Sequence, residues 1–236
     1  MPGGVEGVEA TAGETIVREP AWVRYGLWVV FPLVGGAIGW FLPGIAQWVV
    51  DLPDLPGKGP FRLVASFPRG PATLVAAGVG VLAGLALALV AAYERVTVMV
   101  ARDRVTLKRG DRSTVVLRER VWAAFADGKH LVIVDREGAE PAREKHDLSR
   151  PALAAAFRSH GYPWLDRDPF LDRYRLWVVG VPGLPPGGEA LLAARATALE
   201  KSKNEDAVRM RNELARLGVV VRDEKKAQYW RPAEPL

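Results

Sequence analysis

Side chains able to carry out catalysis or bind a metal are scarce in this sequence of 236 residues. It contains three histidines, His130, His146 and His160, and no cysteine. No two of these histidines are four positions apart, so the zinc-binding pair of a helical H-E-x-x-H motif is missing. The absence of cysteine excludes thiol catalysis, disulfides and cysteine-based zinc or iron–sulfur sites. Gly161 follows His160 and is typical of a helix end, which favours a structural role for that histidine.

Other catalytic patterns are missing as well. The sequence has neither the phosphate-binding loop G-x-x-x-x-G-K-[ST] nor the nucleophile elbow G-x-S-x-G. Asp166, Asp168 and Asp172 suggest a metal site, but Arg167 and Arg173 lie among them and favour a solvated surface. We therefore predict that the protein is not an enzyme and has no cofactor and no metal. Its sequence indicates no small-molecule substrate.

The distribution of charge points instead to a membrane. The chain has 32 Lys and Arg against 27 Asp and Glu, a net charge of +5, yet residues 25–50 and 70–93 contain none of these four residue types. A membrane-spanning helix needs about 20 apolar residues, so both stretches are long enough. We predict spans at about 25–50 and 71–93, with bends at Pro32 and Pro43.

Each predicted span contains one G-x-x-x-G pair. Gly35 and Gly39 form the first pair, and Gly80 and Gly84 form the second. Such pairs allow helix backbones to approach closely, which predicts a packed hairpin or a dimer face. The alternative is that Gly and Ala are simply abundant in this chain.

Basic residues near the ends of the spans predict the orientation of the hairpin. Residues 94–112 carry six Lys and Arg, residues 51–69 carry three, and the N-terminal flank carries two. Basic residues accumulate on the cytosolic side, so we predict that both termini are cytosolic and that the connecting loop is outside. The first 23 residues lack periodicity and the features of a signal peptide, and we predict a disordered tail over 1–23.

The polar part after the second span reads as strands followed by one helix. Val96, Val98 and Val100 alternate with other residues, and Asp127-Gly128 is typical of a hairpin turn. A helix follows from about Ser149 to His160. This order, with LVIVDREGAEPAREKHDLSRPALAAAFRSHGYPW over residues 131–164, resembles the pleckstrin-homology-like domain of the YqeB-type bacterial membrane proteins. The resemblance covers about residues 20–166. It implies a bacterial cell (inner) membrane protein and an assembly or ligand-contact role, without implying phosphoinositide binding.

The C-terminal part predicts two helices and a small β-element. Helices are expected at about 189–203 and 205–217, and Gly218 precedes a Val-rich strand. The stretch ALLAARATALEKSKNEDAVRMRNELARLGVVVRDEKKAQYWR, residues 190–231, resembles the C-terminal end of bacterial cysteinyl-tRNA synthetases. Two departures are Glu224, where that family has Thr, and residues 225–228, where it has a Gly-rich turn.

That resemblance implies an RNA-contacting module, because the family's end piece lies in its anticodon-binding region. Asp223, Trp230 and Arg231 match its terminal motif and would inherit its contacts. Arg209 and Arg216, seven positions apart, share one helix face. Lys225, Lys226 and Arg231 would extend this basic patch, with Tyr229 or Trp230 as a stacking surface. The alternative, which we favour, is that these arginines form pairs such as Glu205–Arg209 on a solvated face and that Trp230 covers the helix pair.

The combined prediction is an α+β membrane protein. It consists of a two-helix transmembrane hairpin, an antiparallel β pleckstrin-homology-like domain with a closing helix, and a small C-terminal helical hairpin plus β-element. The leading hypothesis is a non-enzymatic protein that presents these parts to a partner, either itself or another membrane protein. RNA binding by the C-terminal module is the second hypothesis, and contact of residues 95–112 with anionic lipids is the third. The predicted parts are a tail at 1–23, a transmembrane hairpin at 24–93, the pleckstrin-homology-like domain at 94–165, a linker at 166–188 and the synthetase-like module at 189–236.

Overall fold

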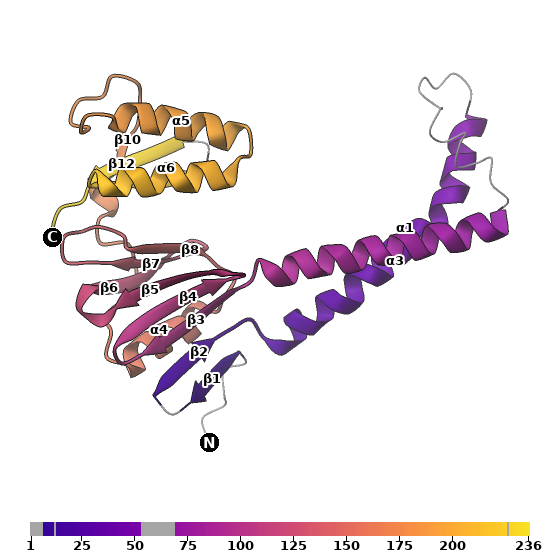
Figure 1. Cartoon of the computed structure of the whole chain (residues 1–236), viewed down its shortest axis with the longest axis horizontal. Helices are drawn as coiled ribbons and strands as arrows, with labels where there is room; N and C mark the ends of the chain where they lie inside the picture. Colours follow the sequence, from indigo (N-terminus) through magenta and orange to yellow (C-terminus); the bar gives the residue numbers. More distant parts are fainter. Residues whose placement is uncertain (1–6, 12, 53–68, 226) are drawn as a thin grey trace. The chain divides into compact units, whose positions relative to one another are not determined.

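Two compact units make up the chain in the computed structural model (Figure 1). The structure describes residues 7–11, 13–52, 69–225 and 227–236. Residues 53–68 of the predicted connecting loop, over 51–69, therefore lie outside the described residues, as do residues 1–6 and 12 of the predicted tail. The first unit includes Arg18–Arg95 and Arg109–Asp111, and the second consists of Val8–Val17, Val96–Lys108 and Arg112–Leu236.

Two long helices form most of the first unit. Helix α1 spans Ala21–Asp51 and helix α3 spans Arg69–Tyr93, which confirms the two predicted apolar helices. Pro32 and Pro43 both lie inside α1, and Figure 1 shows this helix changing direction along its length. Proline removes a backbone donor and clashes with the preceding turn, so it is the expected cause of such bends.

The predicted disordered tail is wrong for the residues between Val8 and Val17. Strands β1 (Val8–Thr11) and β2 (Glu14–Val17) form an antiparallel hairpin, and β2 pairs with β3 (Val96–Ala101). The Val17 side chain is buried in the core of the second unit. These strands have four residues each, too few for a periodic signal, and their pairing with distant β3 supplies the stabilisation.

Two sheets and one helix form the body of the second unit. The first sheet has the order β1-β2-β3-β4-β5, and the second has the order β8-β7-β6-β9. The predicted Asp127-Gly128 turn joins β6 to β7, and Gly128 has a φ of +57°. The remaining elements are β4 (Arg104–Arg109), β5 (Arg112–Leu117), the 3-10 turn η1 (Arg118–Arg120), β6 (Ala123–Asp127), β7 (His130–Val134), β8 (Ala142–Lys145), α4 (Arg150–Ser159) and β9 (Trp164–Leu165).

The second sheet is buried on both faces. Leu131 and Ile133 of β7 contribute to the core shared by the two sheets and α4, whereas Val132 and Val134 pack with Phe170 on the opposite face. This explains why β7 reads as a continuous apolar run rather than an alternating one. The segment after β9 therefore covers a hydrophobic face of the sheet.

The predicted linker over 166–188 is consequently folded in part. It contains the 3-10 turn η2 (Leu171–Arg173) and strand β10 (Arg175–Leu176), and the Phe170 side chain is buried. Its Pro and Gly residues suggested a domain boundary, but its aromatic side chains pack against the second sheet.

The C-terminal module has the predicted helical hairpin and β-element. Helices α5 (Gly188–Glu200) and α6 (Asn204–Arg216) lie against a sheet of order β10-β12-β11, with β11 at Val219–Glu224 and β12 at Ala227–Pro232. Leu192, Leu214, Val219, Val221 and Trp230 form its core.

Candidate functional site

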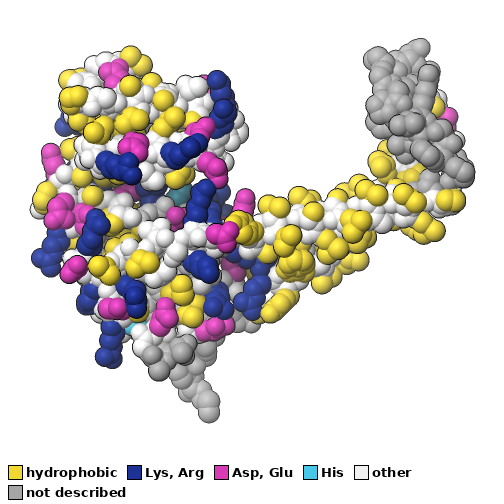
Figure 2. Space-filling model, viewed as in Figure 1, with side chains coloured by type: hydrophobic (Ala, Val, Ile, Leu, Met, Phe, Trp, Pro, Cys, Tyr) yellow, Lys and Arg dark blue, Asp and Glu magenta, His cyan; other side chains and the backbone are white. Residues whose placement is uncertain are grey.

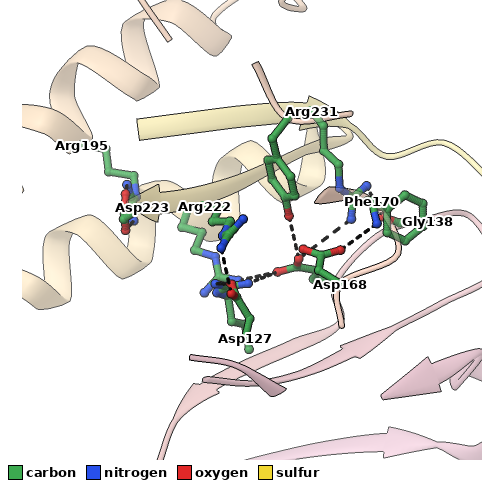
Figure 3. Close-up of polar contacts among 12 residues, drawn as sticks. Asp127, Gly138, Asp168, Phe170, Arg195, Arg222, Asp223 and Arg231 are labelled. Atoms are coloured by element: carbon green, nitrogen blue, oxygen red, sulfur yellow. Dashed lines mark hydrogen bonds and ion pairs between the residues drawn. The ribbon is translucent and has the colours of Figure 1, made fainter. Parts of the chain in front are cut away.

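A cluster of arginines and carboxylates connects the C-terminal module to the second sheet (Figure 3). On the sheet side, Asp127 ends β6, Arg143 lies in β8, and Glu140 lies in the turn before β8. Three arginines approach from the module, Arg211 on α6, Arg222 on β11 and Arg231 on β12. We call these six residues the arginine–carboxylate cluster.

Glu140 is the centre of this cluster, and its side chain is only 3% exposed. Its Oε2 lies 3.0 Å from Nη2 of Arg211 and 3.5 Å from Nη1 of Arg143. Its Oε1 accepts a hydrogen bond from the Tyr174 hydroxyl at 3.2 Å and lies 3.9 Å from Nη2 of Arg231. One buried carboxylate thus balances cations from three separate elements, as a buried charge requires.

Asp127 makes the second connection. Its Oδ1 lies 3.1 Å from Nη2 of Arg222, and its Oδ2 accepts a short hydrogen bond from Arg143. Arg143 therefore lies between the two carboxylates of the sheet. Because Arg222 also reaches Asp127, both strands of the C-terminal β-hairpin are tied to the sheet by charge.

Arg231 is the most deeply buried cation of the arginine–carboxylate cluster, with 0% of the residue exposed. Its Nη1 donates to the backbone oxygen of Gly138 at 2.7 Å, and its guanidinium carbon lies 3.9 Å from the centre of the Phe170 ring. A cation over an aromatic face is stabilised by the ring quadrupole. Gly138 has a φ of +78°, and a Cβ there would approach the backbone oxygen of Glu234 to 2.2 Å, so this close packing requires glycine.

Burial shifts the ionisation of neighbouring groups. It raises the pKa of Asp168, and the negative charges of Glu140 and Asp127 add to this, while the Phe170 amide and Arg231 oppose it. Burial and Glu140 also raise the pKa of Tyr174, so its hydroxyl remains a hydrogen-bond donor to Glu140.

A second ionic group lies inside the module. Arg195 of α5 donates two hydrogen bonds to the carboxylate of Asp223, at 2.6 and 2.7 Å, and a third to Oε1 of Gln228 at 2.6 Å. Burial raises the pKa of Asp223, but the hydrogen bonds and charge of Arg195 outweigh it and hold that pKa below its usual value. This group connects α5 to the β11–β12 hairpin.

The five residues predicted to bind RNA or a partner occupy different environments. Trp230 and Arg231 are buried in the interior, and Asp223 is paired with Arg195. Arg209 and Arg216 are exposed on α6, and they pair with Asp206 and Glu213 respectively, each three residues earlier. The structure therefore places Asp223, Trp230 and Arg231 in three different sets of contacts and leaves the other two on a helix face with neighbouring acids.

The pairing on α6 differs in detail from the expected one. Arg209 pairs with Asp206, whereas Glu205, the expected partner, contacts Arg112 of β5 at 2.7 Å. Sequence analysis named Asp127 as part of a hairpin turn, not of a site, and did not identify Glu140, Arg143, Arg211 and Arg222. The sequence signal in this set is Arg222, an arginine that directly follows three valines in β11.

The four glycines predicted to pack the apolar helices lie where the two backbones approach each other. A Cβ on Gly35 would be 2.1 Å from the Gly80 backbone oxygen, and one on Gly80 would be 2.0 Å from that of Gly35. A Cβ on Gly39 would be 2.1 Å from the backbone oxygen of Ala76, and one on Gly84 would be 2.2 Å from that of Phe31. Any larger residue at these positions would force the helices apart.

Histidines do not form a chemical site with these groups. His160 lies at the end of α4, and its Nε2 is 2.9 Å from the Thr15 hydroxyl of β2. Burial, with Arg143 and Arg211, lowers the pKa of His130 to about 4, so it is neutral near pH 7. Within the described ranges, no three His, Asp or Glu residues are grouped as a metal ion would require.

These features define a class of α+β protein in which a pair of long apolar helices accompanies a two-sheet domain and a docked helical module. Residues 15–165 match the family described as YqeB-like bacterial PH domain, and the chain belongs to that family. Residues 181–231 match the cysteinyl-tRNA ligase anticodon binding domain.

A relative from Bacillus subtilis (strain 168), described as "Uncharacterized protein YqeB", is 38% identical over 209 residues. The match covers 88% of this chain and 87% of the relative. No solved structure matches the chain. Both resemblances found in the sequence are therefore confirmed.

Proposed function

We propose that this protein is a non-enzymatic scaffold, anchored in the bacterial cell membrane by α1 and α3, that presents its second unit to a partner at the inner membrane surface. In this proposal it is a multi-pass protein of the inner membrane, and both termini are cytosolic. The observation that carries the proposal is the exposure of the apolar helices. Large side chains on both of them are more than half exposed, including Trp40, Phe41, Leu74 and Leu82.

Low burial of the two helices supports this proposal over a soluble protein with two core helices. Core helices are mostly buried, but only 17% of the apolar window in Ala21–Asp51 and 11% of that in Thr73–Tyr93 is buried. Figure 2 shows hydrophobic side chains along the visible surface of these helices. An apolar surface of this extent is stable in lipid but aggregates in water.

The arginine–carboxylate cluster supports the scaffold role. Buried arginines of the module pair with buried carboxylates of the sheet, so separating the module from the sheet would leave these charges unpaired. A module fixed in this way offers a partner a preformed surface. The side chains that hold the module to the sheet do not include a nucleophile paired with a general base.

The absence of cysteine allows a direct test of topology. Ser66→Cys places a thiol in the stretch between the spans, and Ser113→Cys places one on exposed β5. We expect a membrane-impermeant maleimide to label Ser66→Cys in intact cells and Ser113→Cys only after permeabilisation. The cysteine-free protein is the control. The reverse pattern would exclude the proposed orientation, and recovery of the chain in the soluble fraction without detergent would exclude the anchor.

RNA binding by the module is the second candidate function, supported by the match of residues 181–231 to an anticodon-binding domain. Arg209 and Arg216 are the exposed residues with which to test it, because Trp230 is buried and its loss would destabilise the module. Full-length protein in phosphatidylcholine nanodiscs should bind tRNA with a steep salt dependence. Arg209→Gln with Arg216→Gln should weaken this binding, and failure to bind at low salt would reject the candidate.

A further inference from the structure

We propose that an open cleft in the second unit binds a small organic anion, a carboxylate, sulfonate or phosphate on a flat or apolar body. The cleft has a volume of about 860 Å³. It lies between the β3–β4 turn, η1, the β7–β8 turn and the residues after α4, and it is separate from the arginine–carboxylate cluster.

The first argument is a guanidinium held in a fixed position. Arg118 donates from Nη1 to the His160 backbone oxygen and from Nη2 to the Gly161 backbone oxygen, both at 2.9 Å. Its guanidinium carbon lies 4.6 Å from the centre of the Tyr162 ring. A Cβ on Gly161 would lie 3.3 Å from Nη2 of Arg118, so glycine leaves room for this placement. Nη1 also donates to the Arg102 backbone oxygen at 3.4 Å, so three of the five N–H donors of the guanidinium are used and two are left for a ligand.

The second argument is the charge of the other lining residues. Arg102 and Arg136 also line the cleft, and both are exposed. Among the residues that the structure describes, neither guanidinium has a hydrogen-bond or ion-pair partner. Of the two lining carboxylates, Asp103 and Glu119, the first lies 3.5 Å from Arg104 outside the cleft. Three guanidinium groups and two carboxylates therefore line the cleft, and one of these carboxylates is paired with an arginine outside it, which favours an anion.

The third argument is the apolar part of the wall. Leu117, Val121, Trp122, Tyr162 and Pro163 contribute to it. Sites for small molecules have volumes of about 300–1,000 Å³ and combine apolar walls with a few polar groups, so this cleft suits a ligand larger than one inorganic ion. An adjoining cleft of about 400 Å³ shares Trp122 and Arg136, so the surface available to the apolar body continues beyond the arginines.

The test uses naphthalene-1-sulfonate as the probe and the full-length protein in phosphatidylcholine nanodiscs. Saturation-transfer NMR should detect binding of the probe, and neutral naphthalene-1-methanol should bind at least tenfold more weakly. Inorganic phosphate should compete poorly because it lacks the flat body. A second set of nanodiscs with phosphatidylglycerol separates two sources of the ligand. Competition by the anionic lipid would identify a lipid headgroup, and unchanged probe binding would identify a soluble anion.

Two variants with matched controls connect this binding to the cleft. Arg102→Gln with Arg136→Gln should weaken probe binding at least tenfold, whereas Arg167→Gln with Arg175→Gln removes the same charge from exposed positions elsewhere and should not. In β5, Leu117→Glu places a negative charge in the cleft and should abolish binding.

Val115→Glu is the control for the Leu117 variant. Both side chains are about half exposed on β5, but Val115 does not line the cleft. The inference is overturned if the wild-type protein does not bind the probe, or if the double arginine variant and Leu117→Glu bind it as well as their controls do.

Discussion

Glu140→Gln is the substitution that best tests how the C-terminal module is held. The glutamine side chain has nearly the same volume and keeps an oxygen to accept the Tyr174 hydrogen bond, so the change removes charge without creating a cavity. It leaves the guanidinium of Arg231, whose side chain is 1% exposed, without its carboxylate partner. Arg143 keeps Asp127, and Arg211 is partly exposed and can be solvated.

These contacts give the size of the expected effect. Breaking a buried ion pair by removing one partner costs about 3–5 kcal/mol. The remaining Asp127 contact and the partial exposure of Arg211 place the expected loss near the lower limit, at about 3 kcal/mol. Since about 1.4 kcal/mol corresponds to a factor of ten in an equilibrium constant, undocking should become more than about 100-fold more frequent.

Hydrogen exchange detects this opening directly, because protected amides exchange only when their region opens. We expect faster exchange in residues 170–176 and 227–232, and unchanged exchange in β3 and β4. Glu213→Gln is the matched control, since it breaks the exposed Glu213–Arg216 pair and should cost less than about 1 kcal/mol. Exchange of Glu140→Gln within threefold of the wild-type rate in both segments would refute the reasoning.

Three further predictions follow from burial and close packing. Gly80→Leu should separate α1 from α3 and lower the melting temperature in detergent, because a Cβ at Gly80 would lie 2.0 Å from the backbone oxygen of Gly35. Gly78→Leu is the control and should have little effect, because a Cβ at Gly78 meets open space. Protonation linked to His130 should lower the free energy of unfolding by about 1–2 kcal/mol as pH falls from about 6.5 to about 4, after allowance for the partial exposure of this side chain. The reason is that the imidazole takes up a proton near pH 6.5 in the unfolded chain but has a pKa of about 4 in the folded state. Urea titrations of His130→Gln should therefore show a weaker dependence of stability on pH. Trp230→Ala should cost about 3–5 kcal/mol by emptying the core of the module, measured by urea unfolding, and a loss under about 1 kcal/mol would contradict its burial.

Much of the fold could be predicted because its signals are local. The two apolar helices follow from runs without charge, and the β6–β7 hairpin follows from Asp127-Gly128. The N-terminal hairpin could not be predicted in the same way. Its strand β2 is stabilised by residues such as Met99, which pairs with Ile16 but lies far away in the sequence.

The candidate site was harder to predict for a related reason. Glu140 and Arg211 are 71 positions apart, and Asp127 and Arg222 are 95 positions apart, so no spacing in the sequence brings them together. Arginine is also rarely buried without a partner, so sequence reasoning places Arg231 on the surface. Its burial becomes understandable only when the Gly138 carbonyl and the Phe170 ring are seen around it.

The inward position of Arg231 also limits how a partner could use the module. In the synthetase resemblance, the end of the module contributes to RNA contact, but here Trp230 is buried in the core of the module, and Arg231 is buried and holds that end to the sheet. A ligand that needed Arg231 would have to separate the module from the sheet first, at the cost of exposing the buried charge on Glu140. We therefore expect any partner of the docked module to contact the outer faces of α5 and α6. Substituting Arg209 or Arg216 should then change the affinity for that partner, because it also breaks the ion pair with Asp206 or Glu213 on the same face of α6.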